Sequence, residues 1–180
     1  MKVWKLYFEL NKYDSLVPES ITLDELQSFD GRRKKDSWRP LSLERMEPGK
    51  KLELSDAPGY NLIIFSKKAL NTLSPLIQDS IEELEVLFEE GEYYAINVTT
   101  VLDVIDYSKS RYITFDDGKK IMVFEKYAFK LCDELIRSNI FKIIDETRGE
   151  AFVSDRFKES VEKNNLTGFR FELVWDSERE

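Results

Sequence analysis

Short apolar stretches, each bounded by polar or turn-forming residues, recur along the whole chain. Strands are predicted within residues 2–10, 38–46, 62–65, 79–92, 93–98, 112–115, 121–124, 141–144, 151–153 and 169–174. Apolar residues recur at helical spacing within residues 23–29, 67–73 and 155–163. The pattern predicts an α+β fold with a mostly antiparallel sheet and a few short helices, in one domain covering residues 1–180.

Several segments have a less regular pattern. Residues 11–60 are interpreted as an elaborated, loop-rich N-terminal part, with a break at 57–59, where the chain reads Ala-Pro-Gly. The pair Ser74-Pro75 is expected to end or kink a helix, or to begin a new helical turn. Residues 101–107 fit a strand or a bend. Residues 125–139 fit either a strand followed by a short helix from Asp133, or one helix.

Two turns are signalled clearly by residue type. Gly91-Glu92 lies between two predicted strands and indicates a hairpin. The residues 116–119, Asp-Asp-Gly-Lys, separate two further strands and predict a second hairpin turn.

Ser154 stands between an apolar pair and a charged helical stretch, where a serine is either a nucleophile or a helix cap. The chain contains no histidine, so the usual activator of a serine nucleophile is missing, and no G-x-S-x-G motif surrounds Ser154. A cap at Ser154, followed by Asp155 near the positive end of the helix, is the favoured interpretation, and Ser66 fits the same role.

Composition limits the function further. The formal net charge is −8, which disfavours nucleic-acid binding and favours encounter with a basic partner. The single cysteine, Cys132, excludes an intrachain disulfide and a thiolate metal cluster. No signal peptide is recognised, and no apolar segment approaches the roughly 18 residues that a membrane span needs. We therefore expect a cytoplasmic protein without metal, cofactor or catalytic residues.

One run of the chain is strongly acidic. Residues 79–92 contain seven acids and no base: Asp79, Glu82, Glu83, Glu85, Glu89, Glu90 and Glu92. Such a run is either a solvated strand face or a negative patch that docks a basic partner. The patch is the candidate partner-binding site of the sequence.

Other charged groups permit alternative functions. Asp103, Asp106 and Asp116 would be the carboxylates of a histidine-free enzyme, metal-assisted or not, although turn and capping roles suit them better. An acidic regulatory adaptor is a further alternative. The basic residues 32–35 are interpreted as a solvated loop.

Four segments together resemble a bacterial family of immunity proteins from polymorphic toxin systems, formerly a domain of unknown function. They are LIIFSKKAL, INVTTVLDVIDYSKS, NIFKI and AFVSDRFKESVEKNNLTGFRF, and the likeness covers residues 60–175. A related branch carries paired C-x-x-C-G motifs, which this chain lacks, so metal binding is not implied.

The resemblance implies a non-enzymatic protein that binds and neutralises a cognate toxin. The motif residues are expected to maintain the fold; they are Asn97, Asp103, Asp106, Ser110, Ser154 and Gly168.

Overall fold

A computed structural model describes residues 1–49, 52–115 and 120–179 of the chain. The described residues form three sheets. The first has the order β13 (Phe169–Asp176), β1 (Lys2–Phe8), β12 (Phe152–Ser154), β11 (Ile140–Ile143) and β8 (Val101–Leu102). The second has the order β4 (Leu54–Gly59), β2 (Asp14–Pro18), β3 (Leu41–Arg45), β6 (Ile81–Leu87), β7 (Tyr93–Val98) and β5 (Ile64–Ser66). The third pairs β10 (Ile121–Lys126) with β9 (Arg111–Thr114).

The predicted α+β class and antiparallel character are confirmed. Seven of the ten strand pairings among the described residues are antiparallel. The helices are α1 (Leu23–Gln27), α2 (Lys67–Ile77), α3 (Asp133–Arg137) and α4 (Asp155–Lys163), with 3-10 turns η1 (Lys35–Ser37), η2 (Gln78–Ser80) and η3 (Ile144–Glu146). No helix among the described segments is both long and apolar enough to cross a membrane.

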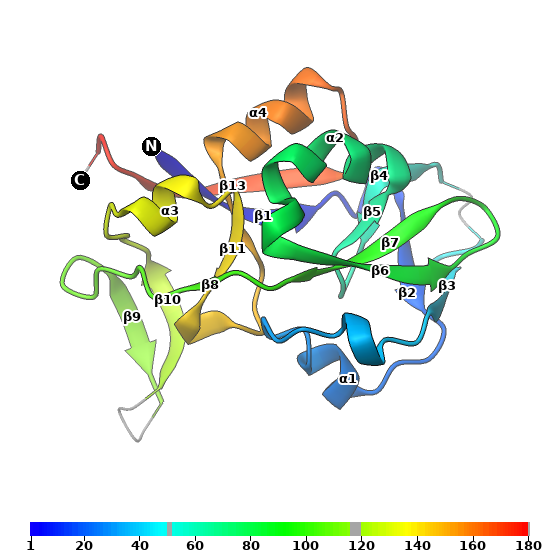
Figure 1. Cartoon of the computed structure of the whole chain (residues 1–180), viewed down its shortest axis with the longest axis horizontal. Coiled ribbons are helices and arrows are strands. Elements are labelled where there is room, and N and C mark those ends of the chain that lie inside the picture. Colours follow the sequence, from blue (N-terminus) through cyan, green and yellow to red (C-terminus); the bar gives the residue numbers. More distant parts are fainter. Residues whose placement is uncertain (50–51, 116–119, 180) are drawn as a thin grey trace.

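Helices α2 and α4 lie side by side over the place where the two larger sheets meet (Figure 1). Both follow a strand through a serine. The Ser66 Oγ accepts a hydrogen bond from the Ala69 N–H at 3.1 Å, and the Ser154 Oγ accepts one from the Phe157 N–H at 3.2 Å. The cap interpretation is therefore confirmed for both serines.

The expected end of α2 at Ser74-Pro75 is wrong. The helix continues to Ile77, because Leu70, Leu73 and Ile77 keep one face buried in the core. Pro75 lacks an N–H, but the carbonyl that would accept it belongs to Asn71, an exposed position that water can reach.

Two strands in the N-terminal part contradict the loop interpretation. Strand β2 was hidden by its polar start and by Pro18, yet Leu16 is fully buried in it. Strand β4 includes residues 57–59, where a break is expected. It is the edge strand of its sheet, and an edge position tolerates Pro58 because one side of the strand needs no ladder hydrogen bonds.

The ambiguous middle segments are short strands, bends and one helix. Of residues 101–107, only Val101 and Leu102 form a strand, and Ile105 makes an isolated bridge with Phe129. Helix α3 then begins at Asp133, so the first of the two expectations for residues 125–139 is the closer one. The predicted hairpin turn at residues 116–119 lies outside the described residues.

The Leu-Thr-Gly segment before β13 joins the two larger sheets. The Asp56 carboxylate on β4 accepts hydrogen bonds from the N–H and the hydroxyl of Thr167, at 2.9 and 3.1 Å. Although burial opposes it, these bonds and those from Ser66 and Lys68 lower the pKa of Asp56. Gly168 has φ +86°, and a Cβ there would stand 2.1 Å from the Ser55 Oγ, so only glycine fits.

Candidate functional site

The seven acids of the predicted patch lie on η2, on β6 and in the turn to β7. Strand β6 alternates between its two faces, so Glu83, Glu85 and Leu87 are exposed, whereas Glu82 and Leu84 point inward. Glu83 stands opposite Ile96 and Glu85 stands opposite Tyr94 on β7, which confirms the predicted hairpin. The sequence pattern therefore gave the strand and its hairpin correctly.

Two of the seven carboxylates are paired with bases from other elements. Arg45 on β3 forms an ion pair with Glu90 at 2.7 Å and another with the buried Asp14 at 2.9 Å. Lys67 at the start of α2 pairs with Glu92 at 2.7 Å. These contacts lower the pKa values of Glu90 and Glu92. The acidic run contains no Lys or Arg, but Arg45 and Lys67 from other parts of the chain neutralise two of its carboxylates.

Glu82 has a structural role. Its carboxylate accepts hydrogen bonds from the Lys34 backbone N–H at 2.6 Å and from the Asn97 Nδ2 at 3.0 Å. Burial raises the pKa of Glu82, but these hydrogen bonds outweigh burial and lower it. The basic loop at residues 32–35 thus lies against the acidic strand.

The remaining carboxylates form what we call the acidic surface: Asp79, Glu83, Glu85 and Glu89. All four are exposed, and none of them has an ion pair with a residue that the structure describes. Leu87, which is 59% exposed, lies between Glu85 and Glu89 along the chain. The binding role of this surface stays a prediction. It now concerns these four acids, because Glu82, Glu90 and Glu92 have partners within the protein.

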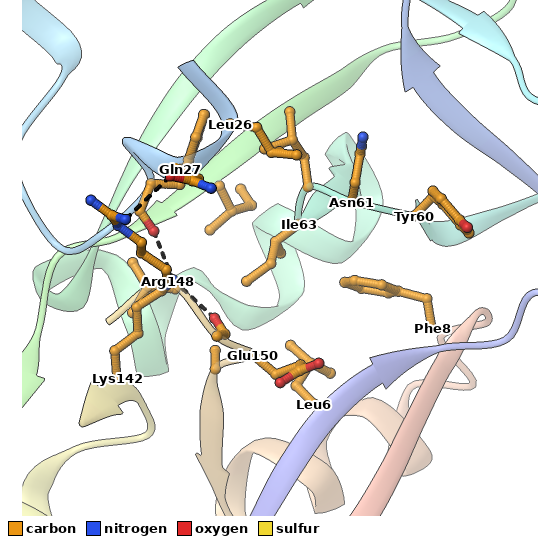
Figure 2. Close-up of a pocket in the computed structure, with 16 residues that line it drawn as sticks. Leu6, Phe8, Leu26, Gln27, Tyr60, Asn61, Ile63, Lys142, Arg148 and Glu150 are labelled. Carbon is orange, nitrogen blue, oxygen red and sulfur yellow. Dashed lines mark hydrogen bonds between the residues drawn. The ribbon is translucent and has the colours of Figure 1, made fainter. Parts of the chain in front are cut away.

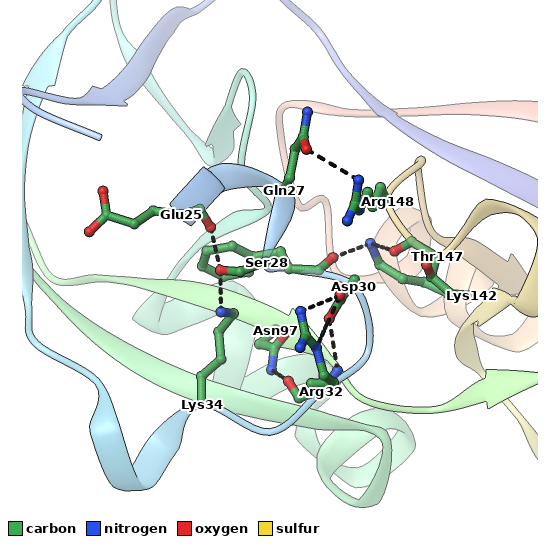
Figure 3. Close-up of polar contacts among 11 residues, drawn as sticks. Glu25, Gln27, Ser28, Asp30, Arg32, Lys34, Asn97, Lys142, Thr147 and Arg148 are labelled. Atoms are coloured by element: carbon green, nitrogen blue, oxygen red, sulfur yellow. Dashed lines mark hydrogen bonds and ion pairs between the residues drawn. The ribbon is translucent and has the colours of Figure 1, made fainter. Parts of the chain in front are cut away.

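A buried lysine holds the N-terminal segment against this part of the molecule, and no sequence signal identified it. The Lys142 Nζ donates to the backbone carbonyls of Phe29, Thr147 and Gly149 at 2.7, 2.8 and 3.1 Å. Figure 3 shows Lys142 with Thr147, beside Asp30, Arg32 and the inward-facing Asn97. Burial lowers the pKa of Lys142 to about 8. Its side chain therefore fixes three loop carbonyls as a charged donor at neutral pH.

A cavity of about 310 Å³ lies between α1, β1 and the loop before β5. Leu6, Phe8 and Ile63 form apolar walls, and Arg148 lies at the polar side, where it donates to the Gln27 side chain at 3.2 Å (Figure 2). The lining residues include no serine, threonine, cysteine or aspartate. The ionisable side chains of the lining are those of Tyr60, Lys142, Arg148 and Glu150.

Of the carboxylates in the alternative enzyme hypothesis, neither Asp103 nor Asp106 lines this cavity. The Asp106 carboxylate accepts hydrogen bonds from the hydroxyl and the N–H of Ser108, and these bonds lower its pKa, whereas a general acid needs a raised one. Asp103 is exposed, and Asp116 lies outside the described residues. Among the described side chains, no group of three or more His, Cys, Asp or Glu is placed to hold a metal ion.

Ser110, Ser154 and Asn97 of the family motifs make contacts within the fold, and a fold role for the exposed Asp103 stays a prediction. The Ser110 Oγ donates to the Asp106 carbonyl at 2.8 Å and accepts from the Ala128 N–H at 3.0 Å, so it fixes the base of the β9–β10 hairpin. Ser154 also donates to the Asn139 Oδ1 at 2.8 Å. The Asn97 Nδ2 donates to the Arg32 carbonyl at 2.8 Å as well as to Glu82.

Comparison with known proteins supports the resemblance. No curated protein matches the chain. The model of the Immunity protein family (Imm11) matches residues 87–176, a narrower stretch than the 60–175 expected from the motifs. The match includes β7 to β13 and excludes α2. Since it covers half of the 180 residues, the chain belongs to the Immunity protein family (Imm11).

Proposed function

We propose that this protein binds a cognate bacterial toxin in the cytoplasm and neutralises it without catalysis. The observation that carries the proposal is the family match over residues 87–176. The hydrogen bonds from Ser108, which lower the pKa of Asp106, suit a structural role for that carboxylate.

The acidic surface supports a basic toxin as the partner. Exposed carboxylates without local counter-ions keep their field in solvent, and the whole chain carries a net charge of −8. A field of this sign raises the rate at which a basic protein meets this one, and salt weakens the effect. In this proposal Glu83, Glu85 and Glu89 act chiefly on the rate of association.

Co-expression with the toxin encoded beside the gene tests the proposal. We expect cells to survive toxin induction only when this protein is present, and the two proteins to co-elute in size-exclusion chromatography. Equal killing with and without this protein, together with separate elution, would contradict the proposal. Stable binding to a host protein instead of the toxin would favour the regulatory adaptor.

A further inference from the structure

The β9–β10 hairpin exposes an apolar face that no described residue covers. Among the described residues, four make up what we call the hairpin patch: Ile113, Phe115, Met122 and Val123, which are 43%, 51%, 52% and 42% exposed. Six of the fifteen exposed large hydrophobic residues of the described chain fall within residues 107–123. Exposed apolar side chains gathered in this way mark interaction sites, whereas scattered ones do not.

The two faces of the hairpin have different tasks. Tyr112 and Phe124 are cross-strand partners on one face. Phe124 is buried there and its ring stacks on Tyr127 with a centroid distance of 4.8 Å, whereas Tyr112 contacts Phe124 edge-on and stays 38% exposed. Ile113 and Val123 are also partners, and they occupy the opposite face because neighbouring residues in a strand alternate. The register shifts between Ile121 and Val123, so Met122 lies at a bulge and belongs to the patch by its 52% exposure. The inner face therefore anchors the hairpin, and the outer face is not needed for that attachment.

The centre of the outer face is apolar, and the exposed partners Arg111 and Lys126 lie at its end. An antiparallel sheet with one face in water normally alternates apolar-in with polar-out, but here both faces are apolar at the centre. A two-stranded sheet also has open edges, which invite pairing with another chain. The arrangement is costly in solution unless a partner covers the patch.

The charge around the patch is opposite to that of the protein. The described residues of 107–131 include five Lys or Arg and one Glu, within a chain of net charge −8. Arg111, Lys120 and Lys126 are exposed and have no ion pair with a described residue. A complementary partner surface is therefore apolar at its centre and carries carboxylates at its rim.

We propose that the hairpin patch is the anchoring contact for the toxin, made with a toxin surface of that chemistry. This inference rests on the proposed function. The hairpin lies entirely within the matched residues 87–176, whereas most of the acidic run precedes them. Figure 1 places β9 and β10 at one end of the molecule and the turn between β6 and β7 at the other. In this proposal the acidic surface raises the association rate, and the hairpin patch lowers the dissociation rate of the complex.

The decisive experiment measures toxin binding kinetics by biolayer interferometry with the full chain. The double variant Ile113→Thr/Val123→Thr keeps β-branched residues in both strands and removes apolar surface. We expect it to dissociate from the toxin roughly 10- to 100-fold faster, with an association rate within about twofold of wild type. Leu23→Gln, which removes an exposed apolar side chain on α1, is the matched control and should bind like wild type.

A charge-reversal experiment tests whether the rim of the partner surface is acidic. Arg111→Glu/Lys126→Glu places carboxylates against the acidic rim and should weaken binding about 10-fold or more. Substitution of the same residues by Gln should have a smaller effect. Unchanged or tighter binding of the Glu variant would show that the rim is not acidic and would overturn that part of the inference.

The outcomes separate the two proposals. If wild-type protein neither binds the toxin nor protects cells, the proposed function fails, and the inference fails with it. If wild type binds and the folded Thr double variant binds within twofold, only the inference is overturned. Should the variant lose its native circular dichroism, hydrogen exchange on the wild-type complex decides. Toxin should protect amides in residues 111–115 and 121–126, and unchanged exchange there would reject the hairpin as the contact.

Discussion

The β6–β7 and β9–β10 hairpins have the same local topology and opposite surface chemistry. The first is built into a six-stranded sheet, and bases from β3 and α2 neutralise two of its acids. The second forms a sheet of its own, and aromatic stacking attaches it to the rest of the molecule. Its free face is apolar and its surroundings are basic.

The difference shows that a charge run and a binding surface are separate properties. Seven acids in sequence look like an interface, yet three of them hold the fold together through Arg45, Lys67 and the segment at Lys34. The hairpin patch has no charge signature, because apolar residues in a strand are read as core until the structure shows which face they occupy.

The largest expected effect comes from separating the β9–β10 hairpin from the core. Phe124 is 7% exposed, and its ring contacts Tyr112 and Tyr127. Phe124→Ala should lower the free energy of unfolding by about 3–4 kcal/mol, because it leaves a cavity beneath the hairpin. Urea denaturation measures it. Val123→Ala on the free face should cost less than about 1 kcal/mol, and equal costs would mean that the two faces are not distinguished as described.

Near the β6–β7 hairpin, the loss of a buried ion pair should lower the stability of the protein. Arg45→Ala leaves the buried Asp14 carboxylate without its guanidinium, so we expect a loss of about 2–4 kcal/mol in the free energy of unfolding. Arg39→Ala, at an exposed position just before β3, should change stability by less than about 0.5 kcal/mol. A loss that vanished in 1 M salt would indicate a solvent-screened pair and would contradict the buried geometry.

Titration of Lys142 should make the stability of the folded protein depend on pH. The pKa of its ammonium is lowered by burial to about 8 in the folded protein, below the usual 10.5, so between these values the unfolded chain binds more protons. Wild-type stability should therefore gain from this group as pH rises from 8 to 10, by roughly 2 kcal/mol.

Lys142→Met removes that gain and leaves three carbonyls without their donor. The difference in unfolding free energy between wild type and Lys142→Met should grow over this pH range, measured by denaturation at pH 7, 8, 9 and 10. A constant difference would show that the folded and unfolded pKa values of Lys142 are the same.

The smallest effect on stability, and a selective effect on kinetics, is expected at the acidic surface. Glu83→Lys/Glu85→Lys/Glu89→Lys should slow toxin association about 10-fold at low salt and flatten its salt dependence, while the dissociation rate changes little. Stopped-flow or interferometry at 20 and 300 mM salt measures both rates. An unchanged association rate would remove the steering role from these residues.

Local sequence signals predicted the elements that depend on neighbouring residues. Ser66 and Ser154 were recognisable as caps, and the alternation at Leu84 and Val86 identified β6 against the high helix propensity of its glutamates. The paired strands around residues 116–119 were recognisable by their turn residues.

The sequence-based predictions were wrong or incomplete where residues distant in the chain determine the local structure. Pro58 lies in a strand because β4 is an edge, and Pro75 lies in a helix because the core holds its neighbours. The partners of the acidic run are separated from it by many residues, as with Arg45 and Glu90. Lys142 showed no signal, since a lysine in the apolar segment NIFKI does not reveal which carbonyls surround it.

Strand β1 is synthesised before both strands that it pairs with, so its hydrogen bonds form only after β12 and β13 have been made. It lies between β12 and β13, with Val3 opposite both Ser154 and Trp175, and Asp155 accepts hydrogen bonds from the Lys2 N–H and the Trp4 indole. These pairings join residues that are far apart in the sequence, a topology that slows folding and cannot close during most of synthesis. Under the proposed function, protection would therefore lag behind translation. A cell that makes the toxin at the same moment would then be safe only if a reserve of finished protein were already present.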